Sequence, residues 1–134
     1  WVIVDPTTGA PTALPANFTD VYGSTITNTK VRVRLEHGEP PEPGPQDDRV
    51  AWQVRRSDLD LIGHVNNARY WSAVEEVLAM RGLPREPISA TIEFRAGLAR
   101  GPATVVHSVS DAGTDIWVVD ERGTTAASIR IAST

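Results

Sequence analysis

Two carboxylates, a histidine and an asparagine fall within one short stretch of the chain, at Asp58, Asp60, His64 and Asn67. An aspartate can take a proton from water or attack carbon directly, and a histidine four residues later can orient water or move a proton. This pair suits reaction at a carbonyl group, where a positioned base contributes about 100- to 10,000-fold in rate. Asp60 and His64 are therefore the candidate catalytic residues.

The same stretch leads into a predicted helix, whose start supplies hydrogen-bond donors in addition to the aspartate and the histidine. The first N–H groups of a helix have no intrahelical partner and lie at the positive end of its dipole. The N–H groups near Asn67 and Ala68 are the candidate oxyanion donors, and one such donor is worth roughly 3 kcal/mol. Asn66 and Glu76 are supporting candidates, whereas Asp58 is expected to cap the turn that follows a strand.

Hydrophobic periodicity predicts the elements that position these residues. Alternation predicts a strand over 50–54, and apolar residues at helical spacing predict a helix over 67–81 that protein surrounds on most sides. Gly82 and Pro84 are typical of a helix end. Further alternating stretches, joined by short turns, predict antiparallel strands. These strands are expected over residues 91–98, 105–109, 116–119 and 127–131.

One apolar helix and one antiparallel sheet can bury each other only if the sheet curls around the helix. The predicted fold class is α+β, a hotdog fold with a curved antiparallel sheet wrapped around one long central helix, over residues 49–134. Residues 15–48 contain a proline-rich run and are predicted as an inter-domain linker. Residues 1–14 echo the last hairpin of the later domain, so they are predicted as the terminal hairpin of a truncated preceding hotdog domain.

Composition excludes several classes of function. The chain has 134 residues, a net charge of −4 and no cysteine. This charge gives no general attraction to nucleic acid, and the lack of cysteine removes thiolate nucleophiles and disulfides. No metal site is expected, because the histidines lack ligand spacing; His37 is expected to be solvated and His107 to pack within a strand. No apolar run suits a membrane span, and a cytoplasmic location is expected.

The motif Asp58-Leu-Asp60-x-x-Gly-His64-Val-Asn66-Asn67-x-x-Tyr70 resembles the signature of hotdog thioesterases, most closely that of the acyl-ACP thioesterase family. The segments Thr91–Arg95 and Trp1–Asp5 resemble further parts of that family, so the resemblance spans most of the chain. The family carries two tandem hotdogs, with its catalytic residues in the second. It implies release of fatty acid from acyl carrier protein in fatty acid biosynthesis, with no metal and no dissociable cofactor. It also matches Asp60 and His64 to the catalytic pair.

Two positions depart from the plant members of that family. Ile62 stands where they have a catalytic asparagine, and Gly97-Leu98 stands where they have a Glu-Cys pair. Simpler hotdog thioesterases work from the motif aspartate and the helix start alone, and Ile62-Gly63 resembles those. The expected partner is acyl carrier protein or a CoA thioester. The candidates for contact with the carrier or its phosphopantetheine are the arginines that flank the motif, Arg55, Arg56 and Arg69.

Two other functions stay open. The departures from the plant pattern suggest a non-catalytic acyl-binding or dimerisation module. A dehydratase or hydratase acting on an enoyl thioester also uses Asp and His, but that class typically has Asn-Pro before its histidine and a five-residue step. Products separate these functions, because a hydrolase yields free acid and thiol while a hydratase yields a 3-hydroxyacyl thioester. Hotdogs normally pair, so a homodimer or a tandem partner domain is expected.

Overall fold

The computed structural model describes residues 3–5, 7–8, 10–23, 37–42, 49–82 and 88–133. The chain divides into two compact units, Trp1–Arg34 and Leu35–Thr134. No helix within the described ranges is long and apolar enough to cross a membrane.

The first unit contains a small hairpin and a short helix. Strand β1 (Ile3–Val4) pairs antiparallel with β2 (Pro11–Thr12), and α1 (Phe18–Tyr22) follows. Asp5 closes the hairpin turn, because its carboxylate accepts the N–H groups of the two threonines after it at 2.8 Å each. A hairpin was predicted over 1–14, and its origin in a preceding domain stays a proposal.

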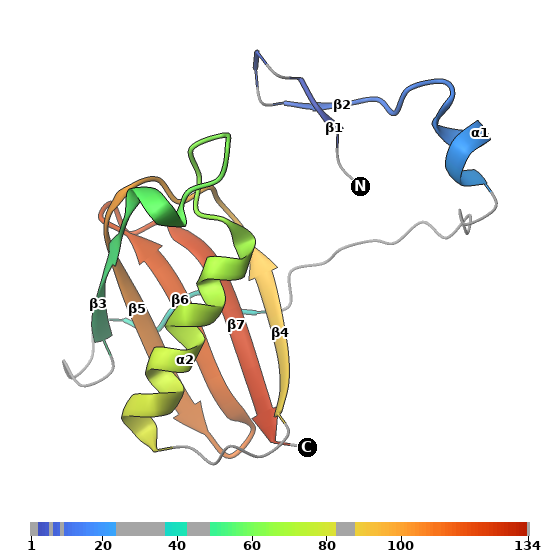
Figure 1. Ribbon diagram of the computed structural model, residues 1–134. Helices are drawn as coiled ribbons and strands as arrows, with labels where there is room; N and C mark the ends of the chain where they lie inside the picture. The colour runs from blue at the N-terminus through green and yellow to red at the C-terminus, as the bar shows by residue number, and fades with distance from the viewer. Residues whose placement is uncertain are drawn as a thin grey trace. The chain divides into compact units, whose positions relative to one another are not determined.

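The second unit is built from one antiparallel sheet and one long helix (Figure 1). The five strands lie in the order β3-β5-β6-β7-β4, and every neighbouring pair is antiparallel. The strands are β3 (Arg49–Val54), β4 (Ile88–Phe94), β5 (Gly101–Ser110), β6 (Gly113–Asp120) and β7 (Thr125–Ser133). The predicted order of a strand, a helix and four more strands is confirmed.

Helix α2 (Tyr70–Arg81) lies across one face of the sheet, and the main core fills the space between them (Figure 1). A single turn, η4 (Asn67–Arg69), precedes it, so the regular helix begins later than the sequence predicts. Gly82 ends it with a φ of 59° and donates its N–H to the Ala79 carbonyl. The residues that α2 buries in the core are Tyr70, Ala73, Val74 and Val77.

The side of α2 that faces away from the sheet is exposed. Trp71 is 38% exposed and Met80 is 55% exposed. The prediction that protein surrounds the helix on most sides is therefore wrong for the described residues. The sheet covers only the stripe of buried positions, because a single sheet reaches one flank of a helix.

The end of β4 differs from the sequence prediction and shapes the candidate site. Alternation predicts a strand through residue 98, but β4 ends at Phe94. The N–H groups of Arg95 and Ala96 both donate to the carbonyl of Ala126, at 2.8 and 3.1 Å. Two successive donors on one acceptor break the regular ladder, so the chain leaves the sheet there and runs toward the start of η4.

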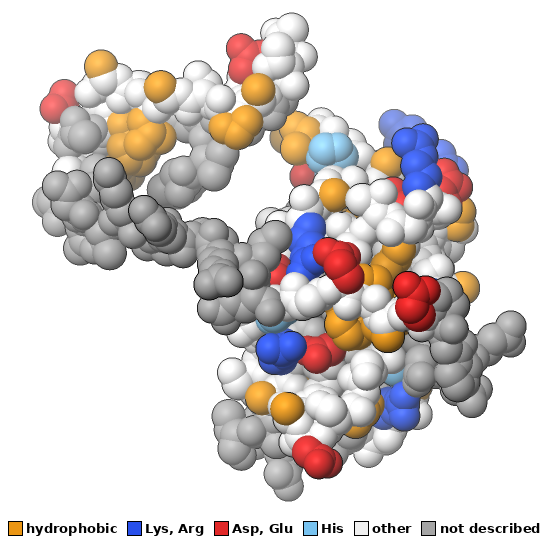
Figure 2. All heavy atoms as spheres, turned by 180° about the vertical axis from the view of Figure 1, so that it is seen from behind, with side chains coloured by type: hydrophobic (Ala, Val, Ile, Leu, Met, Phe, Trp, Pro, Cys, Tyr) orange, Lys and Arg blue, Asp and Glu red, His pale blue; other side chains and the backbone are white. Residues whose placement is uncertain are grey.

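The face of the sheet opposite α2, here called the outer face, carries a smaller apolar cluster of Val106, Trp117 and Val119. Residues 37–42, predicted as linker, lie on this face, where Trp117 Nε1 donates to the Gly38 carbonyl at 2.9 Å. His37 is only 9% exposed, so the expectation of a solvated His37 is wrong. His107 is buried, and its predicted packing is confirmed. Figure 2 shows the molecule from behind, with acidic and basic side chains beside one another.

Candidate functional site

Asp58 anchors the loop that carries the motif. Its side chain is buried, and one oxygen accepts both Nε and Nη2 of Arg69 at 3.0 and 2.7 Å. The other oxygen accepts the Arg55 N–H at 2.8 Å, and the Asp58 carbonyl accepts the Asn66 N–H at 2.9 Å. These bonds tie the end of β3 to the start of η4. The Arg55 N–H and then the Arg69 guanidinium hold the pKa of the Asp58 carboxyl below its usual range.

Asp60 is exposed and closes the tight loop that follows. Its Oδ1 accepts the N–H groups of Ile62 at 2.9 Å and His64 at 3.1 Å, and its own N–H donates to the His64 carbonyl at 2.8 Å. Gly63 accommodates the bend with a φ of 82°. Oδ2 has no hydrogen-bond partner among the residues that the structure describes. The carboxylate is therefore held through one oxygen and presents the other to solvent.

The imidazole of His64 lies directly over the backbone of Gly97. A Cβ at Gly97 would come within 2.6 Å of the ring atoms Nδ1 and Cε1. The neighbouring Val65 N–H donates to the Leu98 carbonyl at 2.8 Å. The loop of the motif and the segment after β4 thus form two facing walls. No hydrogen bond joins the Asp60 and His64 side chains within the described ranges.

The start of η4 offers backbone donors next to these walls. Asn66 Oδ1 accepts the Ala68 N–H at 2.9 Å, so the side chain of Asn66 caps the turn. That leaves the Asn67 N–H as the donor without an intrahelical acceptor. A cavity of about 260 Å³ opens at this point, and burial raises the pKa of Tyr70 beside it to about 12. The cavity is lined by Val65, Asn67, Tyr70, Phe94, Arg95, Ala96 and Gly97.

Asp60 borders a separate, wider depression of about 530 Å³. Leu59, Leu61, Ile62 and Asn66 complete its lining. The linings of the two hollows include consecutive residues, Asn67 in the first and Asn66 in the second. The structure therefore places Asn67 and Gly97 at one cavity, with the His64 ring against Gly97, and places Asp60 in the neighbouring depression.

Glu76 lies apart from the other candidates. It is six residues beyond Tyr70 on α2, which corresponds to about 9 Å along the helix axis. It borders a third cavity of about 190 Å³ between α2 and β3, together with Trp52, Ser72 and apolar residues. A direct role for Glu76 at Asp60 and His64 has no geometric support in the described residues.

The three arginines that flank the motif differ in their surroundings. Arg69 donates to Asp58 through two nitrogens. Arg55 and Arg56 have exposed side chains at the end of β3. Arg55 and Arg56 are therefore exposed, whereas the Arg69 guanidinium is half exposed and already paired with Asp58.

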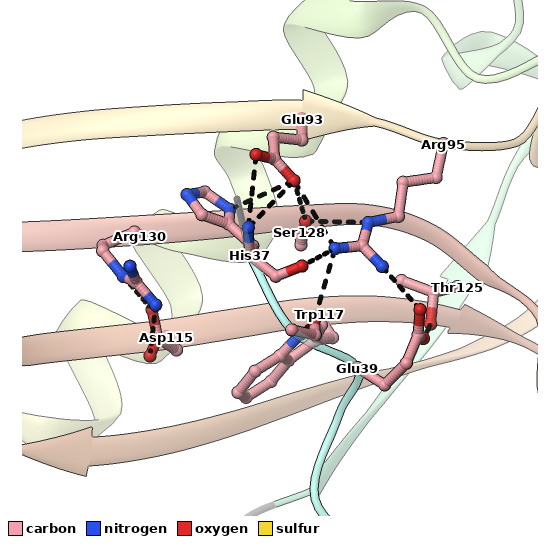
Figure 3. Close-up of polar contacts among 10 residues, drawn as sticks. His37, Glu39, Glu93, Arg95, Asp115, Trp117, Thr125, Ser128 and Arg130 are labelled. Carbon is pink, nitrogen blue, oxygen red and sulfur yellow. Dashed lines mark hydrogen bonds and ion pairs between the residues drawn. The ribbon is translucent and has the colours of Figure 1, made fainter. Parts of the chain in front are cut away.

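Sequence reasoning missed a polar cluster on the outer face, centred on Glu93 and Arg95 (Figure 3). Both side chains are 11% exposed. Their alternation with Ile92 and Phe94 does signal that both side chains lie on the same face. Nothing in the sequence indicated that residues 37–42 would cover them. Among the described residues, no three His, Cys, Asp or Glu side chains gather closely enough to hold a metal ion.

Comparison with known sequences gives a family match. Residues 42–132 match the family described as Acyl-ACP thioesterase C-terminal domain. An uncharacterized protein of Mycobacterium tuberculosis, found in two strains, is 31% identical over 114 residues, covering 83% of this chain and 44% of the relative. The chain therefore spans less than half the length of the curated relatives that it matches.

Two solved structures share the fold over 96% of this chain and 52% of their own length. An acyl-ACP thioesterase from Bacteroides thetaiotaomicron superimposes with a TM-score of 0.69 at 15% identity. A 12:0-ACP thioesterase from Umbellularia californica superimposes with a TM-score of 0.66 at 23% identity. These likenesses confirm the predicted hotdog fold.

Proposed function

The chain belongs to the acyl-ACP thioesterase family, of which it carries the C-terminal domain, and from this we propose that it hydrolyses acyl thioesters. The proposed substrate is a fatty acyl group on acyl carrier protein or on CoA, released as free fatty acid during fatty acid biosynthesis in the cytoplasm. One observation carries the proposal. Asp60 is fixed through Oδ1 by its own loop, and its exposed carboxylate borders a depression whose lining includes Asn66, the residue before η4.

In this mechanism Asp60 Oδ2 takes a proton from water, and the water oxygen bonds to the carbonyl carbon of the thioester. The negative charge on the carbonyl oxygen is stabilised by the Asn67 N–H and the positive end of the helix dipole. The C–S bond then breaks, and the thiolate takes a proton from the imidazolium of His64. A proton passing from Asp60 to His64 restores both groups.

The departures from the plant family fit a site that uses only Asp60 and His64. Ile62 supplies an N–H to Asp60, and any residue type with an N–H can do this except proline. At Gly97 the absence of a Cβ leaves room for the His64 ring. A larger residue there would have to displace that ring.

A non-catalytic acyl-binding module is the second candidate, and one observation favours it. Asp60 already serves as the hydrogen-bond acceptor of its own loop, which explains an aspartate at this position without catalysis. Its carboxylate also borders a different hollow from the one that contains Gly97 and Asn67.

The variant Asp60→Asn separates the two candidates. Asparagine keeps an Oδ1 acceptor for the loop but cannot act as a base, so thiol release should fall about 100- to 10,000-fold while the melting temperature stays unchanged. The rate is measured with a thiol reagent on acyl-ACP and acyl-CoA of several chain lengths, without background because the chain has no cysteine. Asp111→Asn, in an exposed turn, is the matched control.

Each product has a distinct meaning in this assay. A wild-type rate in Asp60→Asn, or acyl binding without hydrolysis in the wild type, supports the binding module. Formation of a 3-hydroxyacyl thioester from an enoyl thioester supports the hydratase. Hydrolysis of acyl-ACP but not acyl-CoA, lost in Asp60→Asn, supports the carrier protein as partner.

The proposal includes pairing with a second hotdog, in a homodimer or with a tandem domain. Strand β3 lies at one end of the sheet, so one of its edges has no partner strand in the described chain. Val50 and Trp52 on its inner side are only partly buried, and both border the cavity between β3 and α2. A second sheet added to this edge would cover them.

A further inference from the structure

Arg95 connects the two sides of the sheet. Its guanidinium lies on the outer face, whereas its backbone follows β4 into the wall of the cavity at the start of η4. The residues just after it, Ala96 and Gly97, line that cavity, and the His64 ring lies against Gly97. The Arg95 backbone and the His64 imidazole are therefore connected through the two residues Ala96 and Gly97.

The outer side of Arg95 is held by a dense set of acceptors (Figure 3). Nη1 donates to Glu39 at 2.7 Å, and Nε donates to the Ser128 hydroxyl at 3.2 Å. Nη2 donates to the carbonyls of His37 and Gly38 and to Glu93. Five acceptors around one planar guanidinium fix its orientation, which a lysine ammonium at the same place cannot reproduce.

The acceptors are themselves fixed to the sheet and to residues 37–42. The Glu93 carboxylate accepts the His37 N–H at 3.3 Å and the Ser128 hydroxyl at 3.3 Å. The second oxygen of Glu39 accepts the Thr125 hydroxyl at 3.1 Å. Residues 37–39 therefore act as a clamp that holds Arg95 from the outside.

The inner side is fixed by backbone bonds to β7 and to the loop of the motif. The Arg95 N–H donates to the Ala126 carbonyl at 2.8 Å, and the Leu98 carbonyl accepts the Val65 N–H at 2.8 Å. Between these two bonds lies Gly97, which has no side chain of its own to hold it in place. The Ala96 N–H also donates to the Ala126 carbonyl at 3.1 Å, so the position of Gly97 against His64 depends on how residues 95, 96 and 98 are held.

We propose that Arg95 is a positioning residue for the site: held by residues 37–39 and Glu93, it sets the place of Gly97 and thereby of the His64 imidazole. The proposal rests on the proposed function only for its kinetic consequence. Displacing a catalytic group by about 1 Å can cost on the order of 100-fold in rate. Loosening the outer clamp should therefore lower kcat while substrate binding changes little.

Arg95→Lys is the first variant to test, because it keeps the charge and removes the planar fork. In the full chain, kcat should fall about 10- to 100-fold with little change in KM. The ring-proton signals of His64, assigned by their loss in His64→Ala, should move in the NMR spectrum. Arg130→Lys is the matched control, because Arg130 pairs with Asp115 on the outer face, remote from residues 95–98 (Figure 3).

Double variants separate positioning from general stability. If Arg95 acts through His64, adding Arg95→Lys to His64→Ala should lower the melting temperature further but leave kcat unchanged. If the two losses in kcat multiply, Arg95 does not act through His64 and the proposal is overturned. Gly97→Ala should reproduce the shift of the His64 signals from the inner side.

The NMR measurement decides the proposal even if the wild type hydrolyses nothing. His64 signals that move no further in Arg95→Lys than in Arg130→Lys overturn it, whatever becomes of the thioesterase assay. If Arg95→Lys does not fold, Glu39→Gln takes its place. The Glu39 side chain is 75% exposed, and this substitution removes only one acceptor oxygen. The His64 signals should then move less but remain displaced, and unmoved signals overturn the proposal.

Discussion

Asp58 and Asp60 are the same residue type, two positions apart, and the fold gives them opposite environments. Asp58 is 3% exposed and pairs with Arg69, whereas Asp60 is exposed and pairs only with backbone N–H groups of its own loop. Burial with a cation keeps the first carboxylate as an anchor. Exposure leaves the second carboxylate accessible to water, which the proposed mechanism requires.

Asp58→Asn tests the anchor. The amide cannot accept both the Arg55 N–H and the Arg69 fork as an anion does, so the free energy of unfolding should fall by about 1–3 kcal/mol. Because folding lowers the pKa of Asp58, its stabilisation is present above the unfolded-state value of about 3.9 and is lost as pH falls through the lower folded value.

Urea unfolding between pH 2 and pH 7 measures both effects. The wild type should lose stability in acid more steeply than Asp58→Asn, so the two curves converge at low pH. Asp111→Asn, at an exposed turn, should follow the wild-type curve. Parallel curves for wild type and Asp58→Asn would contradict a charged anchor at this position.

At the scale of elements, strand β3 gives the next prediction. If this edge pairs with a second hotdog, a charge on the edge strand should weaken the pairing, because lysine on an edge discourages strand addition. Ala51→Lys, at an exposed position of β3, should shift light scattering toward the monomer. Ser108→Lys, exposed on β5 inside the sheet, carries the same charge and should not. A wild type that is strictly monomeric contradicts pairing by this chain alone.

Periodicity predicted the elements well, because one buried face imposes a spacing of two on strands and near four on a helix. It failed at residues 95–98, where the pattern continues although the ladder stops. The pattern there reflects other contacts. Leu98 is buried in the core although it belongs to no strand, and the His64 ring occupies the space where a side chain at Gly97 would lie. Alternation records which side chains are buried, and it does not record where the hydrogen-bond ladder ends.

The sequence points to the candidate residues of the site but not to their arrangement. Asp60, His64 and Asn67 follow from residue type and spacing, because they share one loop. The pairing of Asp58 with Arg69 and the approach of Gly97 to His64 join residues that are distant in sequence. A spacing rule along one segment says nothing of such contacts, and the same limit hid the clamp of residues 37–39 on Arg95.

At the scale of the whole molecule, the chain divides after Arg34, well before the boundary at residue 49 that composition predicts. The proline-rich composition is real, yet backbone carbonyls within residues 37–42 accept hydrogen bonds from Arg95 and Trp117 on the sheet. A backbone carbonyl accepts hydrogen bonds whatever its residue type, so a proline-rich segment can still pack against a sheet.

Two shortened chains test this division. A chain that begins at Leu35 retains the whole second unit and should unfold cooperatively at the wild-type temperature. A chain that begins at Pro43 loses the acceptors of Arg95 and the partner of Trp117. Losing these hydrogen bonds, together with the burial that residues 37–42 give to Arg95 and Trp117, should cost about 3 kcal/mol, which lowers the melting temperature by roughly 10–20 °C in a domain of this size. Thermal unfolding followed by circular dichroism compares the two.

The difference between the shortened chains is what matters, because both lack the first unit. Equal melting temperatures would show that residues 37–42 add nothing to the second unit, which contradicts the hydrogen bonds from Arg95 and Trp117. A large loss already in the chain that begins at Leu35 would show instead that the first unit supports the second. The expected pattern is that the chain beginning at Leu35 keeps its stability and the chain beginning at Pro43 loses it. That pattern would make residues 37–42, with their hydrogen bonds to Arg95, part of the folded domain.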